Sequence, residues 1–469
     1  MDNKYKRLLH NSIWTLAGNT GSKVLSFLLL PLYTRWLGTA GFGESDLVTT
    51  YSSFLVCIMA LCVSDAIFVF TKNQNKETKD EYYSSSLFFI LLVLAFWMII
   101  WFILGRCFSY YHVENSFSNN LWYIYGIVVT TFLQQYTQQF ILSLEKIKIY
   151  SFTGIIHTLM TFLMSFLLIP SYGVRGYIFS MIFSNLVTAL YSFCFSGSYN
   201  FISFSRVKIV TIRDVLKYSI PLIPNAIMWW LVSALNRPVM EHHLDYSSIG
   251  IFAVANRFPA VIIMVFSVFS VSWNISVFEE YKSKDFEQFY SKTFKLLFSC
   301  ITAISSAIIL FSDVIIKLFA SSDFKDASLY MPVLIIGALF SCYSAFFGTC
   351  FSVERKSKYF FYSSLWGAIT AVVLNAILIP CWGVWGTCVS TVLSFFSMFI
   401  SRYFYSLKFV KAKLLSRSLL YGVVLLFVTG VSIYIESYFV RALAFGIVVM
   451  LLYLFDGRLL LARLKKMLN

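Results

Sequence analysis

The sequence predicts an all-α polytopic membrane protein with about fourteen transmembrane helices, arranged as two parallel six-helix lobes followed by a C-terminal helix pair. Of its 469 residues, 59% are hydrophobic and only 13% are charged. A water-soluble protein of this size needs more polar surface than that composition supplies. The apolar segments have the length at which a helix crosses about 30 Å of hydrocarbon, which favours helices over a β-barrel. An internal repeat supports the division into two lobes.

Segments of spanning length follow one another along the whole chain. The first lobe contains spans near 11–32, 44–70, 84–105, 121–144, 151–170 and 174–196. The second contains spans near 214–238, 247–273, 292–318, 328–352, 359–380 and 383–406, and the final pair lies near 415–436 and 438–456. The predicted divisions are therefore 1–206, 207–410 and 411–469. Connections of no more than about twenty residues leave no room for a soluble catalytic or nucleotide-binding domain.

The basic residues predict the orientation of these spans. If the N-terminus is cytoplasmic, 28 of the 37 Lys and Arg residues fall on the inner side and 6 on the outer side. This distribution favours cytoplasmic positions for both termini. The net charge of +15 then reflects topology and contact with anionic membrane lipid, and we expect no nucleic-acid partner.

The repeat is clearest in two proline–glycine segments, LLIPSYGVRGYIFSMIFS at 167–184 and AILIPCWGVWGTCVSTVLS at 376–394. They share Pro170/Pro380, Gly173/Gly383 and Gly176/Gly386 at an offset of 210, and Pro31/Pro238 and Gly43/Gly250 match at an offset of 207. We interpret each segment as a helix end at Pro, a tight outer hairpin and a close return of the chain. Because each half holds an even number of spans, the lobes should run parallel, with a cleft between them.

Charged and polar residues deep in the spans are the candidate binding residues. Lys23 lies near the middle of span 1, Arg257 lies within span 8, and Arg237 lies near the outer end of span 7. A cation at the centre of a lipid-facing helix costs roughly 2.5–3.5 kcal/mol, so these side chains should face a wet cavity or an anion. Asn19 and Asn256 lie on the polar faces of spans 1 and 8. The excess of cations favours a phosphate or diphosphate ligand.

Other interpretations of these residues remain open. Lys23 could pair with Asp65 to stabilise the first lobe, and Arg237 could extend outward to the membrane surface. Asp65 and His157 are candidates for coupling to H⁺ or Na⁺, against the alternative that both are structural. The nine cysteines contain no CxxC pair and the five histidines are dispersed, so we expect no metal site and no cofactor. No nucleophile–base pair suggests catalysis, so we predict a transporter and not an enzyme.

With these features, the chain resembles the polysaccharide-transporter branch of the multidrug/oligosaccharidyl-lipid/polysaccharide exporter superfamily, the Wzx-type flippases of O-antigen and capsule repeat units. The resemblance rests on the fourteen spans, the IPxxGVxG hairpin in both halves and the segment GIFAVANRFP at 250–259. It implies a bacterial inner-membrane flippase for O-antigen, capsule or exopolysaccharide synthesis. An undecaprenyl-diphosphate-linked glycan would cross to the outer leaflet by alternating access through a cationic cavity, near polysaccharide polymerase machinery. Lys23, Arg237 and Arg257 match the basic residues of relatives by span.

Three other functions remain open. A multidrug cation/proton antiporter of the same superfamily would need an acidic cavity residue, for which Asp65 is available deep in span 2. A lipid II flippase shares the head-group chemistry and is not excluded by the cavity charges. A membrane glycosyltransferase or polymerase should have a large outer loop, and the outer loops of this chain are short.

Overall fold

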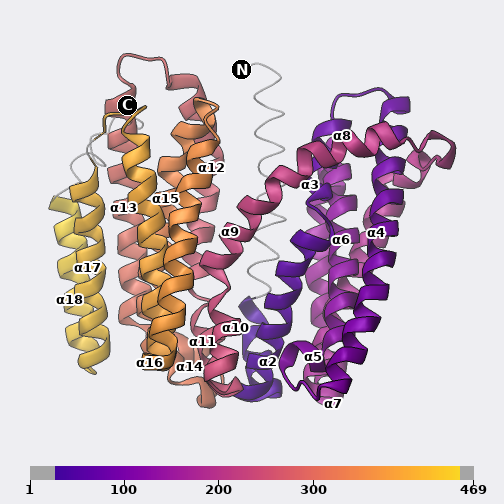
Figure 1. Ribbon diagram of the computed structural model, residues 1–469. Coiled ribbons are helices and arrows are strands. Elements are labelled where there is room, and N and C mark those ends of the chain that lie inside the picture. Colours follow the sequence, from indigo (N-terminus) through magenta and orange to yellow (C-terminus); the bar gives the residue numbers. More distant parts are fainter. Residues whose placement is uncertain (1–26, 413, 455–469) are drawn as a thin grey trace. The chain divides into compact units, whose positions relative to one another are not determined.

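The computed structural model describes residues 27–412 and 414–454, in which all regular structure is helical (Figure 1). The chain forms two compact units that divide between Trp230 and Leu231. We refer to them as the N-unit and the C-unit and describe each by itself. The predicted boundaries at 206/207 and 410/411 remain predictions.

The N-unit contains seven α-helices and the beginning of an eighth among its described residues. They are α2 (Leu30–Met59), α3 (Val63–Thr71), α4 (Lys76–Tyr110), α5 (Ser116–Asn119), α6 (Leu121–Ser143), α7 (Ile147–Ser196), α8 (Ile209–Ser219) and the first residues of α9 (Ile223–Ser233). Short 3-10 turns at Ser198–Phe201, Phe204–Arg206 and Ile220–Leu222 flank α8.

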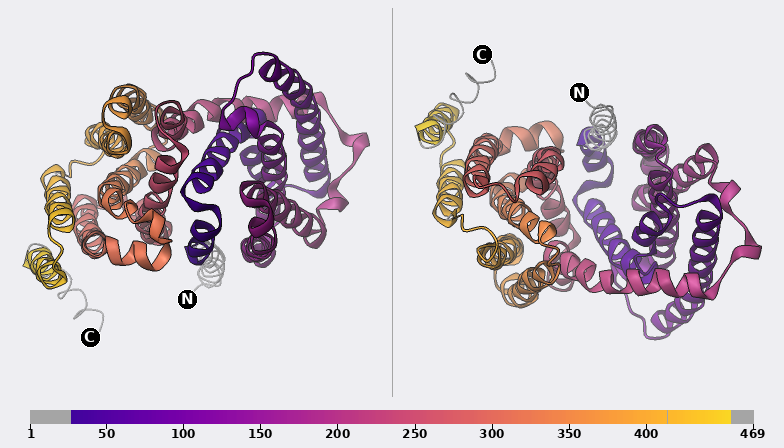
Figure 2. Two further views of the ribbon diagram at one scale, coloured as in Figure 1. Left: turned by 90° about the horizontal axis from the view of Figure 1, so that it is seen from below. Right: turned by 90° about the horizontal axis from the view of Figure 1, so that it is seen from above.

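The C-unit continues from α9 through the second half of the chain. Its helices are α10 (Asn236–His243), α11 (Tyr246–Ala255), α12 (Pro259–Glu280), α13 (Phe286–Leu310), α14 (Ser312–Phe319), α15 (Ala327–Val353), α16 (Lys358–Ser406), α17 (Leu415–Tyr434) and α18 (Tyr438–Leu452), with a 3-10 turn at Ser322–Phe324. In the end-on views, α17 and α18, drawn in yellow, lie at the edge of this unit (Figure 2).

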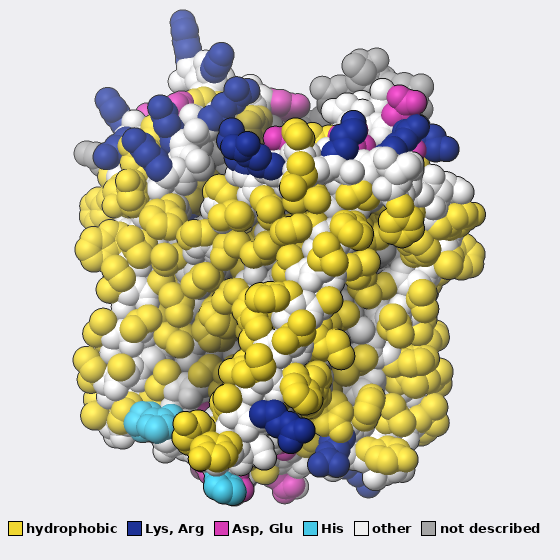
Figure 3. All heavy atoms as spheres, turned by 45° about the vertical axis from the view of Figure 1, so that its right-hand side comes forward, with side chains coloured by type: hydrophobic (Ala, Val, Ile, Leu, Met, Phe, Trp, Pro, Cys, Tyr) yellow, Lys and Arg dark blue, Asp and Glu magenta, His cyan; other side chains and the backbone are white. Residues whose placement is uncertain are grey.

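The prediction of an all-α polytopic membrane fold is confirmed. In the described residues, eight helices are long and apolar enough to cross a membrane, and α2 with α3 forms a ninth span bent by 51°. Two of these helices, α7 and α16, reverse direction at an internal glycine, so each provides two spans. Most of the first predicted span, 11–32, lies outside the described residues. On the face shown in Figure 3, hydrophobic side chains cover most of the surface of the described helices.

The two repeated segments form the same hairpin. Gly173 has φ 54° and ψ −129°, and Gly383 has φ 55° and ψ −128°, a backbone conformation that favours glycine. A Cβ on Gly176 would overlap the backbone carbonyl oxygen of Leu168. The corresponding Cβ on Gly386 would overlap the backbone carbonyl oxygen of Leu378. The predicted hairpin and close return are thus present in both units.

The prolines of the repeat do not end the helices, which corrects one detail of the prediction. Pro170 and Pro380 lie inside α7 and α16, and each chain reverses three residues later at Gly173 or Gly383. Proline lacks only one backbone donor. The helix therefore continues for the few residues that remain before the turn.

Helix α9 belongs to both units. The indole nitrogen of Trp230 donates to the backbone oxygen of Thr50, 3.3 Å away, and its ring lies 4.4 Å from that of Phe54 in the N-unit. Two residues later, Val232 is buried next to Gly367 in the C-unit. One turn of α9 therefore contains the boundary between the units.

Candidate functional site

Three helix breaks contain or adjoin residues that the sequence singles out. Helices α2 and α3 are interrupted at 60–62, α9 and α10 at 234–235, and α11 and α12 at 256–258. Broken helices at membrane depth leave backbone groups and helix ends available to a substrate or an ion, as in many transporters. The breaks are therefore the structural feature around which a candidate transport site can be described.

The break between α11 and α12 contains Asn256 and Arg257. Asn256 follows the last residue of α11, is half-buried, and donates its backbone N–H to the carbonyl of Phe252 at 2.9 Å. Arg257 is exposed, and α12 begins two residues later at Pro259. The N–H groups of Ala260 and Val261 donate to the carbonyls of Arg257 and Phe258, so the chain crosses this break as a hydrogen-bonded turn.

Arg237 lies in the first turn of α10 and is buried, with 7% of its surface exposed. Its Nη1 donates to the carbonyl oxygen of Ser233 at 2.8 Å and to Oδ1 of Asn236 at 3.0 Å, and its guanidinium lies 5.1 Å from the ring centre of Phe252. Asn236 in turn donates to the hydroxyl of Thr391 at 3.1 Å. These contacts hold the side chain within the C-unit, so the alternative that it extends outward to the membrane surface does not describe this structure.

Asp65 lies in the first turn of α3, just after the break, and its side chain is exposed. The break is sharp because Leu61 and Cys62 both have φ of 52°, a left-handed conformation that is uncommon for residues other than glycine. The Sγ atoms of Cys57 and Cys62 lie 3.5 Å apart across it. Lys23 and Asn19 lie outside the described residues, so the pair Lys23–Asp65 and the cavity predicted around span 1 stay predictions.

His157 belongs to a polar chain within the N-unit. Its Nε2 lies 3.0 Å from Oδ1 of Asn185 on the second arm of α7, and the amide of Asn185 donates to the hydroxyl of Thr131 on α6 at 2.9 Å. This arrangement links three helical segments through neutral groups. The structure does not bring His157 next to an acidic residue that would form a proton relay with it among the described residues.

Two buried arginines have a role in the fold that their sequence positions do not reveal. Arg402 on α16 donates to the hydroxyls of Ser363 and Ser364 and to the carbonyl of Ser344, at 3.0–3.3 Å. Arg441 on α18 pairs with Asp313 at 2.7 Å. From the distribution of basic residues, both arginines are expected near the membrane surfaces. The only local sequence feature that indicates burial is that each arginine lies within or next to an apolar run.

No group of three or more His, Cys, Asp or Glu side chains in the described ranges is arranged to hold a metal ion. The charged residues at the breaks in the described C-unit are Arg237 and Arg257, and Asp65 follows the break in the N-unit. Guanidinium groups bind anionic groups by charge and hydrogen bonds.

Comparisons with known proteins identify the family to which the chain belongs. The family model described as "Polysaccharide biosynthesis protein" matches residues 8–273, and the family model MatE matches residues 221–377. An uncharacterized membrane protein of Methanocaldococcus jannaschii, MJ1375, is 23% identical over 421 residues, which cover 86% of this chain and 99% of that protein.

Two solved structures share the fold. The lipid II flippase MurJ, in an inward closed conformation, has a TM-score of 0.70 and 15% sequence identity, and the match covers 96% of this chain and 100% of MurJ. An inward-facing multidrug resistance transporter of the MATE family has a TM-score of 0.59 and 13% identity over 81% of this chain and 93% of that one. The first family model covers more than half of the chain. The chain therefore belongs to the polysaccharide biosynthesis protein family, within the multidrug/oligosaccharidyl-lipid/polysaccharide exporter superfamily.

Proposed function

We propose that this membrane transporter is a flippase of the Wzx type. It moves undecaprenyl-diphosphate-linked oligosaccharide repeat units from the cytoplasmic to the outer leaflet of a bacterial inner membrane, for O-antigen, capsule or exopolysaccharide synthesis. Both termini are cytoplasmic in this proposal. The observation that supports it most directly is the match of residues 8–273 to the polysaccharide biosynthesis family.

The charges at the helix breaks supply a physical argument for a diphosphate head group. Arg257 lies at the α11–α12 break and Arg237 at the start of α10, and the sequence adds Lys23 in span 1. An isolated charge transferred into hydrocarbon costs tens of kcal/mol in idealised estimates. A hydrated cavity lined by cations removes most of that cost. We infer that alternating access exposes this cavity first to the inner and then to the outer side.

The residues have distinct roles in this proposal. Arg257 and Lys23 bind the diphosphate, while Asn19 and Asn256 bond to it or to the first sugar. Arg237, buried and bonded to Asn236, holds the local backbone and contributes positive potential. Asp65 and His157 are the candidates for coupling to H⁺ or Na⁺, and membrane lipid and the polymerase machinery are the expected partners.

The test is transport in proteoliposomes of a short-chain polyprenyl-diphosphate oligosaccharide with a fluorescent sugar end. Wild type is compared with Lys23→Ala and Arg257→Ala, and Lys325→Ala, on a surface loop of the C-unit, is the matched control. We expect translocation in wild type and control, and at least a tenfold loss in both folded test variants. Equal rates in all four proteins would contradict the proposed roles of Lys23 and Arg257.

A second candidate, a multidrug cation antiporter, is favoured by the MatE match at 221–377 and the exposed Asp65. The same vesicles are therefore tested for organic-cation uptake driven by a proton or sodium gradient, with Asp65→Asn beside wild type. Cation uptake that needs Asp65, without movement of lipid-linked sugar, would replace the flippase proposal. Movement of lipid II but no other lipid-linked glycan would identify the third candidate, a lipid II flippase.

A further inference from the structure

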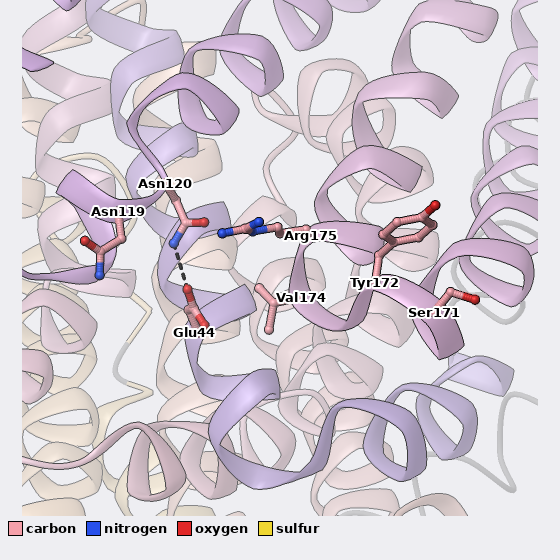
Figure 4. Close-up of a pocket in the computed structure, with 7 residues that line it drawn as sticks. All are labelled: Glu44, Asn119, Asn120, Ser171, Tyr172, Val174 and Arg175. Carbon is pink, nitrogen blue, oxygen red and sulfur yellow. Dashed lines mark hydrogen bonds between the residues drawn. The ribbon is translucent and has the colours of Figure 1, made fainter.

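The N-unit contains a polar cavity at the end of its helices opposite the basic segments that precede α4 and follow α7. Its volume is about 750 Å³, within the roughly 300–1,000 Å³ typical of small-ligand sites. Seven residues line it: Glu44, Asn119, Asn120, Ser171, Tyr172, Val174 and Arg175 (Figure 4). They come from α2, the end of α5 with the residue that joins it to α6, and the hairpin of α7. By the predicted orientation, this end is the outer one.

The polar groups of the cavity are arranged around one buried amide. Asn120 is 4% exposed, and its Nδ2 donates to Oε1 of Glu44 at 2.8 Å and to the carbonyl of Ser116 at 3.1 Å. The Arg175 side chain extends toward Asn120 and Glu44 (Figure 4). Within the described part of the chain, its guanidinium forms no ion pair, so its donors remain available to a ligand.

Close packing holds α2 against the α7 hairpin at the cavity. A Cβ on Gly41 of α2 would lie 3.2 Å from Cγ2 of Val174, so α2 and the hairpin are in near contact. The turn itself is determined by Gly173 and by the approach of Gly176 to Leu168. Ser171, Tyr172 and Arg175 are therefore attached to a rigid turn without being required for its shape.

The second copy of the repeat provides an internal comparison. Gly383 has the same backbone angles as Gly173 within 1°, yet the three polar positions of the hairpin carry other residues. At the offset of 210, Ser171, Tyr172 and Arg175 correspond to Cys381, Trp382 and Trp385. At the offset of 207, Glu44 corresponds to Ile251. The same turn thus forms with apolar side chains, and the polar set in the N-unit is an addition that folding does not require.

The chemistry of this set selects the ligand. One carboxylate and one guanidinium balance in charge, which disfavours a strongly anionic or cationic ligand. Two amides and two hydroxyls can both donate and accept hydrogen bonds, and the Tyr172 ring, on a side chain 65% exposed, offers a flat apolar face. Neutral sugars need this combination, because they present hydroxyls around their edge and C–H groups on their faces.

We propose that this cavity is a sugar-binding site on the outer side of the N-unit, which receives the glycan of the transported molecule after translocation. This role rests on the proposed function. Glu44 and the Oδ1 atom of Asn120 accept from neighbouring sugar hydroxyls, because both N–H groups of the Asn120 amide already bond to Glu44 and Ser116. Asn119 and Arg175 donate to sugar oxygens, and Tyr172 stacks on a ring of the glycan. Binding there would favour the outward-delivered state over return of the glycan.

The first experiment measures binding without transport. Saturation-transfer NMR is recorded with the purified full chain in phosphatidylcholine nanodiscs and a panel of soluble methyl glycosides and disaccharides. Wild type is compared with Glu44→Gln/Arg175→Trp, which introduces the tryptophan of the second repeat, and with Arg106→Ala, an arginine at the same end that does not line the cavity. We expect millimolar binding in wild type and Arg106→Ala, and at least tenfold weaker binding in the double variant.

Absence of saturation transfer to every sugar in wild type would overturn the proposal, as would equal binding by the double variant. Thermal unfolding establishes that the double variant is folded. If it is not, the single variant Arg175→Trp, which uses the residue that the second hairpin already tolerates, replaces it in the comparison.

A second experiment distinguishes this proposal from the proposed function. In the lipid-linked sugar assay, the double variant should retain less glycan on the outer side at steady state than wild type and Arg106→Ala. Translocation in wild type with an unchanged steady state in the variant would refute the sugar site alone. No translocation in wild type would refute the flippase, and soluble-sugar binding would then identify a glycan from another source.

Discussion

The Nη1 atom of Arg441 lies 2.7 Å from Oδ1 of Asp313, which connects α18 to the first turn of α14. The same guanidinium donates from Nε to the carbonyl of Ile435 at 2.7 Å, from Nη2 to that of Ser432 at 2.9 Å and from Nη1 to that of Leu310 at 3.2 Å. Arg441 thus joins the end of α13, the end of α17 and the start of α18. The C-terminal helix pair is attached to the C-unit through this one side chain as well as by apolar packing.

Arg441→Ala should weaken the attachment of α17 and α18. Loss of hydrogen bonds from a buried charged group costs about 1.5–3 kcal/mol, and Asp313 would lose its partner. We expect a lower melting temperature, measured with a thiol-reactive dye that reports exposure of the buried Cys342, Cys350 and Cys388. Arg441→Lys should recover only part of the loss, and Lys325→Ala should have no effect. A melting temperature equal to that of wild type for Arg441→Ala would contradict the anchoring role.

The same ion pair predicts a dependence of stability on pH. Burial raises the pKa of Asp313, but the hydrogen bond from Tyr438 and the charge of Arg441 outweigh burial, and the net pKa is below the ordinary value. A carboxyl group with a lowered pKa stabilises the fold fully above its ordinary pKa of about 3.9 and loses this effect as pH falls toward the folded value. Melting temperatures of wild type should therefore decrease more steeply below about pH 4 than those of Asp313→Asn. Parallel curves would exclude this contribution.

The hairpin glycines should differ in their tolerance of alanine. Gly176→Ala and Gly386→Ala place a Cβ on a backbone carbonyl oxygen, so the two arms of α7 or α16 must separate. Gly173→Ala meets no atom within 4 Å and adds only backbone strain of about 1–3 kcal/mol. Gly430→Ala and Gly446→Ala, where the new Cβ also meets open space, should be neutral or slightly stabilising. Expression and melting temperature should be lowest for Gly176→Ala and Gly386→Ala, intermediate for Gly173→Ala, and highest for Gly430→Ala and Gly446→Ala. A well-folded Gly386→Ala protein would contradict this order.

Arg237 and Arg257 should respond differently to replacement by alanine. Arg237 is buried and bonded to Ser233 and Asn236, so its loss should lower the melting temperature. Arg257 is exposed at the α11–α12 break, so its loss should reduce transport and lower the melting temperature less than the loss of Arg237. The two measurements on each purified variant separate these effects. Normal stability with lost transport in Arg237→Ala would instead assign that residue to substrate.

Native cysteines can test the predicted orientation. Cys107 near the end of α4 and Cys381 beside the Gly383 hairpin are exposed at the predicted outer side, and Cys194 is exposed at the opposite end of α7. A membrane-impermeant maleimide should label Cys107 and Cys381 in intact cells and Cys194 only after permeabilisation. Single Cys→Ser variants assign each labelled site. The reverse pattern would place both termini outside.

The membrane fold and the paired hairpins could be predicted because their causes are local. Apolar length determines a span, and the pattern of Pro170, Gly173 and Gly176, repeated 210 residues later, determines a reversal. The helix breaks could not be predicted from a hydropathy window, which averages over about nineteen residues. Pro259 marks one break, but Leu61 and Cys62 adopt left-handed conformations without any local signal. Packing of distant helices stabilises that geometry.

The candidate site was predicted less completely for a similar reason. Sequence reasoning identified Arg257 and Asn256, which lie at a break, but did not show that Arg237 is enclosed by Ser233, Asn236 and Phe252. The partners of Arg402 lie 38 to 58 residues away in sequence, and the Arg441 partners Asp313 and Leu310 lie 128 and 131 residues away. The cavity at Glu44 and Arg175 combines three distant segments. No local pattern reveals such groupings.

The sharing of α9 between the units has a mechanical consequence. Trp230 is bonded within the N-unit and Val232 is packed within the C-unit, so any strain that passes along the chain from one unit to the other passes through one helical turn. Under the proposed alternating access, a substitution that stiffens this turn should slow transport without touching any substrate contact.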